Sequence, residues 1–231
     1  SEEEYKKSTK YEKDRQYWAQ KFETIPEIAS IPILSSKTVS NEEVSDSMKE
    51  NLENLQANRE ELSISSSLLE EIKDFCASYK VSLFNFLTAI YAIYVGRVSN
   101  LEDFCFGTPI LNRSNYKEKA TVGMFINILP LRISLEEGLT FSEFLSSIAT
   151  NSMALLRHQK YSYQTILQDL RKKDHSLSSL YKIMISYQIT KMNEKQDSIP
   201  HESTWFFNHT IADDIDIHIF DLNDAKQLNI A

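Results

Sequence analysis

The chain has 231 residues, of which 42% are hydrophobic and 25% charged, so it has the composition of a globular protein that can bury a core. Its formal net charge of −8 argues against a nucleic-acid function, because binding to a phosphate backbone depends on clustered Lys and Arg. No apolar run approaches the roughly 18 residues that span a bilayer, and the acidic residues after Ser1 are the opposite of a signal-peptide start. We therefore expect a cytoplasmic protein that binds neither nucleic acid nor membrane.

The first 60 residues favour a helical arm followed by a polar connection. Tyr11, Trp18 and Phe22 recur at approximately helical spacing, which predicts a helix over about residues 8–22 with one apolar stripe. The composition then turns to Ser, Asn, Glu and Lys, which cannot form much core. We divide the chain into an N-terminal helical arm and connector (1–34), a polar surface linker (35–60) and a body (61–231) that ends inside a strand.

The body alternates predicted strands with predicted helices. A strand at Glu61–Ile64 precedes a helix that a capping box at Ser67–Glu70 opens, and a second capping box at Thr140–Glu143 opens a later helix. Ser82 caps a helix that is apolar almost all round and is therefore expected to be buried. Further strands are expected at about 103–111, 126–133, 181–189, 205–207, 215–219 and at the end of the chain, and a short helix near 163–170. This alternation indicates an α/β sandwich.

Glycine is rare in this chain and two glycines stand in one segment. There are four glycines in 231 residues, and Gly107 and Gly123 both lie between residues 107 and 132. A glycine beside or within an apolar strand marks a bulge, a tight turn or a close approach of the backbone. We therefore expect this segment to be shaped for a particular contact.

Four motifs, in a fixed order, carry a resemblance to a known family. They are Gly107-Thr108-Pro109 with Asn112-Arg113, then VGMFINILPLR (122–132), then HQKYSY (158–163), then LYKIMISYQ (180–188). They resemble the GTPxxxR, IGxFVNTLPLR, HQDYPFE and PLFQVMFSYQ motifs of condensation domains in nonribosomal peptide synthetases. Tyr17-Trp18 resembles the pair that opens the same half of those domains. The resemblance therefore covers nearly the whole chain.

The resemblance implies the fold and the parent activity. It implies the chloramphenicol acetyltransferase-like α/β sandwich, of which this chain is one of the two subdomains. Condensation domains act through a HHxxxDG motif in their N-terminal half, and neither a His-His nor an Asp-Gly pair occurs here. The chain is thus similar to a C-terminal half that supplies one wall of the active-site tunnel and part of a carrier-docking surface, without a catalytic residue of its own. A non-catalytic binding or scaffold module with the same half-fold, or a fragment of an epimerization or cyclization variant, are the alternatives.

The implied partners are the N-terminal subdomain of the same domain, donor and acceptor carrier proteins with their phosphopantetheine arms, and an adjacent adenylation domain. The parent reaction would form an amide bond between carrier-bound aminoacyl or peptidyl thioesters in peptide antibiotic biosynthesis. We expect no cofactor bound directly to this chain. The resemblance places these residues at the tunnel or near substrate: Gly107, Pro109, Arg113, Gly123, Phe125, Asn127, Arg132, His158, Gln159 and Ser186.

Several of these residues also have a structural interpretation. Asn127 stands between apolar residues in a predicted strand, so it faces the tunnel or ties down a bulge as a hydrogen-bonded amide. Arg113 and Arg132 anchor loops through salt bridges or face a phosphopantetheine arm. His158 ends a long helix, where a cation complements the helix dipole. After it, Lys160, Ser162 and Gln164 replace the Asp, Pro and Glu of the family motif.

Two further patterns do not support a site. His209 to Asp213 form an HxxxD string that lacks the second His and the following Gly, so we do not expect it to be catalytic. Asp213, Asp214, Asp216 and His218 could be grouped as a metal site. The last three alternate with isoleucines, however, which indicates the solvated face of a strand. Cys76 and Cys105 stand among apolar residues and are predicted to be buried free thiols. No GxSxG, GxxxxGK[ST] or GxGxxG motif is present.

Overall fold

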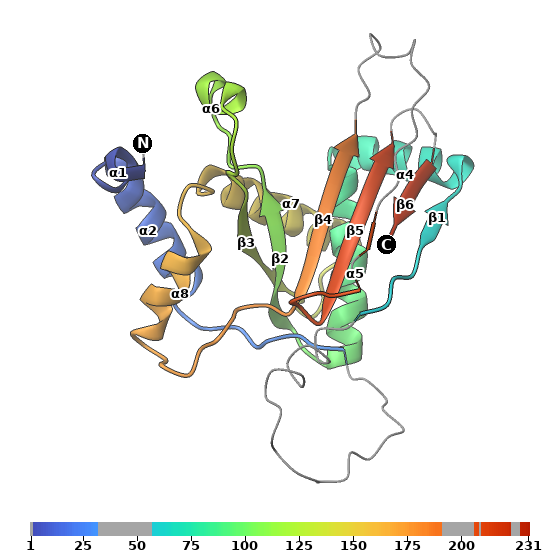
Figure 1. Cartoon of the computed structure of the whole chain (residues 1–231). Helices are drawn as coiled ribbons and strands as arrows, with labels where there is room; N and C mark the ends of the chain where they lie inside the picture. Colours follow the sequence, from blue (N-terminus) through green and yellow to red (C-terminus); the bar gives the residue numbers. More distant parts are fainter. Residues whose placement is uncertain (1, 32–56, 191–205, 208, 223–226) are drawn as a thin grey trace, which may run out of the picture.

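The computed structural model describes residues 2–31, 57–190, 206–207, 209–222 and 227–231, and these form one mixed sheet with helices around it (Figure 1). The helices are α1 (Glu2–Lys6), α2 (Thr9–Lys21), α4 (Ser66–Tyr79), α5 (Leu83–Ser99), α6 (Tyr116–Ala120), α7 (Phe141–Arg157) and α8 (Tyr163–Arg171). The strands are β1 (Leu62–Ile64), β2 (Asp103–Ile110), β3 (Asn127–Ser134), β4 (Ile183–Thr190), β5 (Ile215–Leu222) and β6 (Gln227–Ile230).

The sheet has six strands in the order β1-β6-β5-β4-β2-β3. β4 runs parallel to both β2 and β5, and the other neighbouring pairs are antiparallel. The register pairs Gly107 with Met184, and Ser186 with His218. Because paired residues share a face and successive residues alternate, these four side-chain positions lie on the same face of the sheet.

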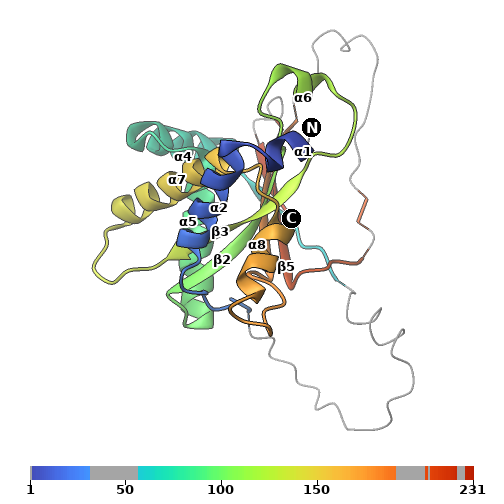
Figure 2. The same cartoon turned by 90° about the vertical axis from the view of Figure 1, so that its left-hand side faces the viewer.

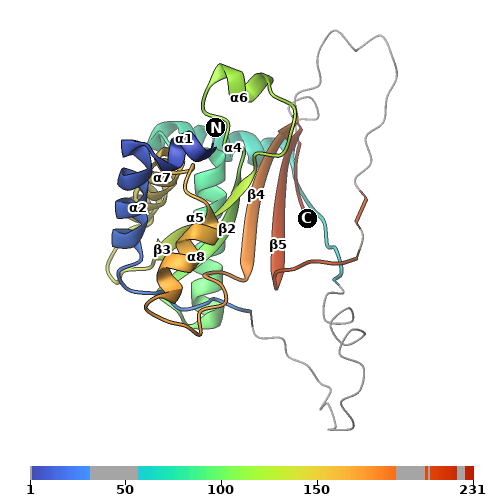
Figure 3. The same ribbon diagram turned by 60° about the vertical axis from the view of Figure 1, so that its left-hand side comes forward.

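The two faces of the sheet differ in how they are covered. Figure 2 shows α4, α5 and α7 together on one side, where they enclose the apolar face. The core there includes Phe104, Phe106, Leu131, Ile185 and Ile219, all of which are buried. On the opposite side α8 packs against β3, and α2 packs against α8. No described helix lies over β4, β5 and β6 on that side, as Figures 1 and 3 show. We call this uncovered part of the sheet the open face.

Local capping explains most helix starts. Ser82 caps α5, as predicted, and accepts a hydrogen bond from the Asn85 N–H. Thr140 and Glu143 form the predicted capping box of α7. The capping box predicted at Ser67–Glu70 is wrong, because Ser65 caps α4 and the helix begins two residues earlier than expected. Three consecutive serines offer alternative caps, and the pattern alone did not choose among them.

Other expectations have mixed outcomes. The strand at 205–207 is wrong for Phe206 and Phe207, which lie outside any strand, whereas Trp205 lies outside the described residues. The strand at the end of the chain is confirmed as β6. The linker at 35–60 lies outside the described residues except for its last four positions, and the domain division stays a prediction. Cys76 and Cys105 are buried free thiols, as predicted.

No single described helix is both long and apolar enough to cross a membrane. α4 and α5 pass such a test only as a pair, and that pair is bent by 99°.

Candidate functional site

Arg113 holds the segment between β2 and β3 in place. This segment comprises residues 111–126, and we call it the α6 segment. Arg113 donates to the carbonyls of Glu118, Thr121 and Gly123, with distances of 2.6 Å to the last two. Its guanidinium also lies 4.2 Å from the centroid of the Phe125 ring. Three carbonyls held by one side chain fix the course of the segment. Arg113 therefore anchors this loop, but through backbone carbonyls where we predicted a salt bridge.

The α6 segment presents apolar side chains to solvent and projects beyond the end of the sheet (Figure 1). The exposed fractions are 72% for Leu111, 88% for Tyr116, 100% for Val122, 88% for Met124 and 54% for Ile126. Apolar residues exposed together mark a contact surface more often than they mark a free surface. The segment therefore has the character of an interface.

The α6 segment is tied to the loop after α7 by an ion pair. Lys160 contacts the carboxylate of Glu118, and the Ser114 N–H donates to the same carboxylate at 2.7 Å. The hydrogen bond from Lys160, with those from Ser114, lowers the pKa of Glu118 to about 2. Lys160 is one of the residues that departs from the family motif, and this pair gives the departure a structural use.

Asn127 begins β3 and holds the loop that carries His158 to Tyr163. Its Nδ2 donates to the carbonyls of Gln159 at 2.9 Å and Tyr161 at 3.0 Å. Its Oδ1 accepts from the Tyr163 N–H at 3.4 Å. Both ends of the amide are used within the protein, which agrees with the structural interpretation of this residue. Gln159 closes the end of α7 by donating to the Leu156 carbonyl at 2.8 Å.

His158 joins the end of α7 to the N-terminal arm. Its Nδ1 lies 2.6 Å from Oδ1 of Asp14, whose side chain is fully buried. Its ring stacks on Tyr17 at 3.9 Å, and its carbonyl accepts from the Trp18 indole at 3.2 Å. Asp14 also accepts from Tyr5 at 2.7 Å. The Tyr17-Trp18 pair and the HQ motif are therefore two halves of one contact.

Arg132 forms the second anchor of the arm. It makes a two-pronged ion pair with Asp103, at 2.8 and 2.5 Å, and donates to the carbonyls of Lys21 at 2.6 Å and Thr24 at 2.9 Å. With Tyr17 and Lys21 it lines a cleft of about 440 Å³. Burial and the charge of Arg132 lower the pKa of Lys21.

Gly107 allows a close approach, as its position in a strand predicts. A Cβ built on Gly107 would lie 2.4 Å from the ring of Tyr181, far inside contact distance. Tyr181 is buried and packs at 5.1 Å against Tyr163 of α8. The glycine therefore lets an aromatic ring lie flat on the sheet at the border of the open face. Pro109, two residues on, is partly exposed, and Gly123 is exposed with a φ of +145°.

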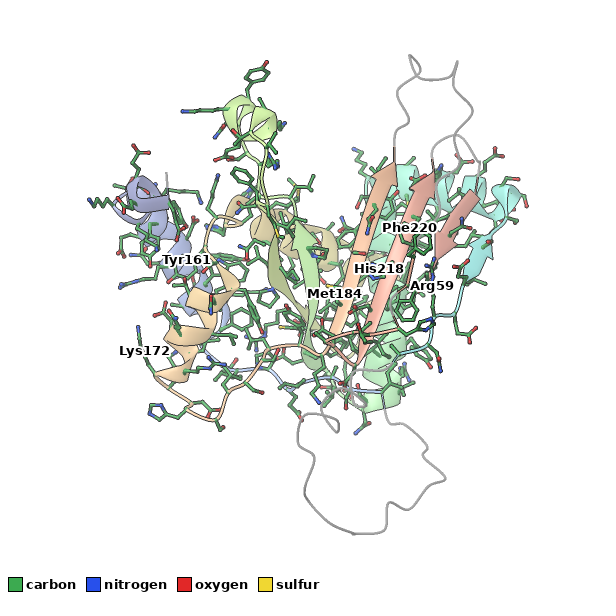
Figure 4. The ribbon with its side chains drawn as sticks, in the orientation of Figure 1. Arg59, Tyr161, Lys172, Met184, His218 and Phe220 are labelled. Carbon is green, nitrogen blue, oxygen red and sulfur yellow. The ribbon has the colours of Figure 1, made fainter. Side chains whose placement is uncertain are left out.

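The open face carries a polar pair made of a buried serine and a partly exposed histidine. Ser186 of β4, 2% exposed, has its Oγ 2.7 Å from Nδ1 of His218 on β5. Figure 4 shows His218 with Met184, Phe220 and Arg59 around it. Burial, with the nearby charge of Arg59, lowers the pKa of His218, and burial raises the pKa of Asp216 on the same strand. The sequence pattern predicted a solvated face here, but His218 and Asp216 are only partly exposed.

The predicted site residues thus fall into two places. Arg113, Asn127, Arg132, His158 and Gln159 hold the arm and the loops, and Gly123 and Phe125 lie in the α6 segment. Gly107 and Pro109 of β2 and Ser186 of β4 make no contact with the arm that the structure shows. Asp14, Asp103, Glu118, Arg59 and His218 contribute to these contacts and were missed as site residues. The i,i+4 pair of Lys10 and Asp14 was a signal available in the sequence, although it did not indicate burial. Among the described residues no group of three or more His, Cys, Asp and Glu is arranged to hold a metal ion.

Comparisons with known proteins agree on one family. Residues 1–230 match the family model described as "Condensation domain". The chain is 33% identical over 230 residues to Surfactin synthase subunit 1 of Bacillus subtilis, covering 100% of this chain and 6% of that protein. It is 28% identical over 184 residues to Gramicidin S synthase 2 of Aneurinibacillus migulanus, covering 79% of this chain and 4% of that protein.

Solved structures show the same fold. The first condensation domain of the CDA synthetase has a TM-score of 0.69 at 17% identity, covering 99% of this chain and 46% of that chain. The EpoB cyclization-docking bidomain from Sorangium cellulosum has a TM-score of 0.73 at 14% identity, covering 99% of this chain and 44% of that chain. The predicted chloramphenicol acetyltransferase-like fold is confirmed. The chain spans less than half of these solved chains and less than a tenth of the curated relatives above.

Proposed function

Because the chain belongs to the condensation-domain family, we propose that it is the C-terminal part of an amide-forming domain of a nonribosomal peptide synthetase. The observation that carries this proposal is the match over residues 1–230 together with a coverage of 46% of a solved condensation domain. In this proposal, the share of that domain that the chain does not cover is the half in which the family carries HHxxxDG. No such motif occurs in this sequence.

The reaction is aminolysis of a thioester. The amine of an acceptor aminoacyl thioester attacks the carbonyl of a donor thioester, the C–N bond forms, and the C–S bond breaks. The amine loses a proton to a base and the leaving thiolate gains one. Holding both thioesters on carrier proteins makes the step effectively unimolecular, which contributes much of the rate. The base belongs to the N-terminal half, so this chain binds and orients without catalysing.

The open face supports the assignment of a tunnel wall. It is the part of the sheet that no described helix covers, and it carries polar side chains, Ser186 and His218, in a partly buried setting. Gly107 and Tyr181 form its border toward α8. Substrate thioesters on phosphopantetheine arms would pass over this surface. The anchors at His158 and Arg132 would keep the wall rigid by fixing the arm.

The α6 segment supports a partner contact. Its exposed Val122 and Met124 would be costly to leave in water, so we assign this surface to the N-terminal half of the same domain. Donor and acceptor carrier proteins and an adjacent adenylation domain complete the proposed assembly, in the cytoplasm. A binding module that never had an N-terminal half is the alternative. An upstream HHxxxDG in the full-length protein favours the condensation domain over that module.

Association of the two halves tests this proposal. The chain is mixed with the separately produced upstream segment and the dissociation constant is measured by calorimetry. We expect Val122→Glu and Met124→Glu to weaken binding by at least tenfold, because each buries a charge at the contact. Tyr79→Glu, a matched change at an exposed aromatic residue of α4, serves as the control. Equal binding by all three variants would overturn the assignment of the α6 segment.

A further inference from the structure

The orientation of the His218 ring on the open face is fixed by a neighbouring side chain. Ser186, its partner in the register of β4 and β5, is buried, and its Oγ lies 2.7 Å from Nδ1 of His218. When one ring nitrogen of histidine is fixed by a neighbour, the other nitrogen is oriented as well. Nε2 is therefore the ring nitrogen left for a ligand. His218 is partly exposed, so a group lying on the open face can reach it.

The charges around His218 select the kind of group that it can bind. Burial and the nearby charge of Arg59 lower the pKa of His218, and this positive charge, which is paired with Glu61 at 2.6 Å, disfavours a cationic ligand. Asp216 lies two residues earlier on the same face and disfavours an anionic ligand. Burial and Arg59 also disfavour the protonated form of the imidazole itself. The remaining class is a neutral hydrogen-bonding group.

Two single atoms near His218 that lack a hydrogen-bond partner narrow the class of ligand further. Nε of Arg59 and Oδ1 of Asp216 are buried and have no hydrogen-bond partner among the described residues. One is a donor and the other is an acceptor, and leaving either without a partner costs free energy. A carboxamide or a peptide unit carries both an acceptor oxygen and a donor N–H. Met184 and Phe220 supply apolar flanks for the carbons next to it (Figure 4).

We propose that His218, positioned by Ser186, determines substrate specificity by hydrogen-bonding through Nε2 to an amide group of the acyl chain that lies on the open face. The proposal rests on the proposed function, since it takes the open face as a wall of the substrate tunnel. His218 here recognises substrate and does not act as the base. Its Nδ1 partner is a hydroxyl and not a carboxylate, so the ring lacks the partner that stabilises a protonated imidazole in catalytic triads.

The experiment compares two thioester probes that differ only in the amide. Asparaginyl-pantetheine and leucyl-pantetheine have nearly the same shape, and their dissociation constants are measured with the full-length protein that contains this chain. We expect the asparaginyl probe to bind about 5- to 10-fold more tightly, the worth of one neutral hydrogen bond. His218→Phe keeps a ring but abolishes that preference, and His218→Gln, whose amide nitrogen can reach the position of Nε2, restores part of it.

The positioning of the His218 ring by Ser186 is tested by a separate measurement. In Ser186→Ala the imidazole loses its orienting partner, so we expect the preference to fall by about 2- to 5-fold and the ¹⁵N shifts of the His218 ring to change. Ser186→Thr keeps the hydroxyl, so we expect it to retain the preference for the asparaginyl probe and the ¹⁵N shifts of the His218 ring. A wild-type protein without preference, or a preference that survives His218→Phe, overturns the inference. Binding is measured without turnover, so amide formation with either probe tests the proposed function separately.

Discussion

Replacing Gly107 with alanine tests the close approach that shapes the border of the open face. The new Cβ would lie 2.4 Å from Cε2 of Tyr181, more than 1 Å inside ordinary contact, so the buried ring has to move. Overpacking of this kind costs about 1–3 kcal/mol. We expect the free energy of unfolding to fall by that amount in urea titrations followed by the fluorescence of the buried Trp18.

A double-mutant cycle separates the clash from other effects. Tyr181→Leu removes the ring, and in that background Gly107→Ala has nothing to displace. It is then expected to be neutral or to stabilise by up to about 0.5 kcal/mol, because alanine reduces the entropy of the unfolded chain. If Gly107→Ala costs as much in the Tyr181→Leu background as in the wild-type protein, the steric argument is refuted.

Three further predictions concern the anchors. Arg132→Ala removes the ion pair with Asp103 and the contacts with the carbonyls of the arm. We expect the free energy of unfolding to fall by about 2–4 kcal/mol. Arg97→Ala, at an exposed arginine, is the control and should cost less than about 0.5 kcal/mol. The ionised carboxylate of Glu118 stabilises the fold, because its pKa of about 2 in the folded protein lies below its value in the unfolded chain. Its contribution to the free energy of unfolding is therefore present above about pH 4.3 and is lost as the pH falls toward 2. Glu118→Gln should flatten stability against pH in that window; an unchanged slope would contradict the role of Lys160. Asn127→Asp sets a carboxylate against two carbonyl oxygens, so its melting temperature should fall further than that of Asn127→Ala.

The elements that the sequence predicted best are those with local causes. Ser82 and Thr140 cap helices through hydrogen bonds to residues three positions on, which a short pattern contains. The strand expected at 205–207 is absent at Phe206 and Phe207. Aromatic content was its main support, and Phe206 is 94% exposed with no partner strand to pack against among the described residues. Strand formation depends on such a partner, which a local pattern does not reveal.

The contacts of the candidate site were harder to predict than its motifs. Tyr17-Trp18 and His158 were both identified, but Asp14, which connects them, lies 144 residues from His158 and looked like an ordinary surface residue of a polar helix. Lys160 and Glu118 are 42 residues apart, and Ser186 and His218 are 32 apart. Pairs at these separations depend on the strand order, which a single sequence does not show.

Amide formation between loaded donor and acceptor carrier proteins tests the central claim most directly. The assay compares this chain alone, the upstream segment alone, and the two together. We expect product when both halves are present, and none from this chain by itself. Product from this chain alone, lost in His209→Ala, would contradict the account, because it would place the catalytic histidine in the HxxxD string that we have set aside.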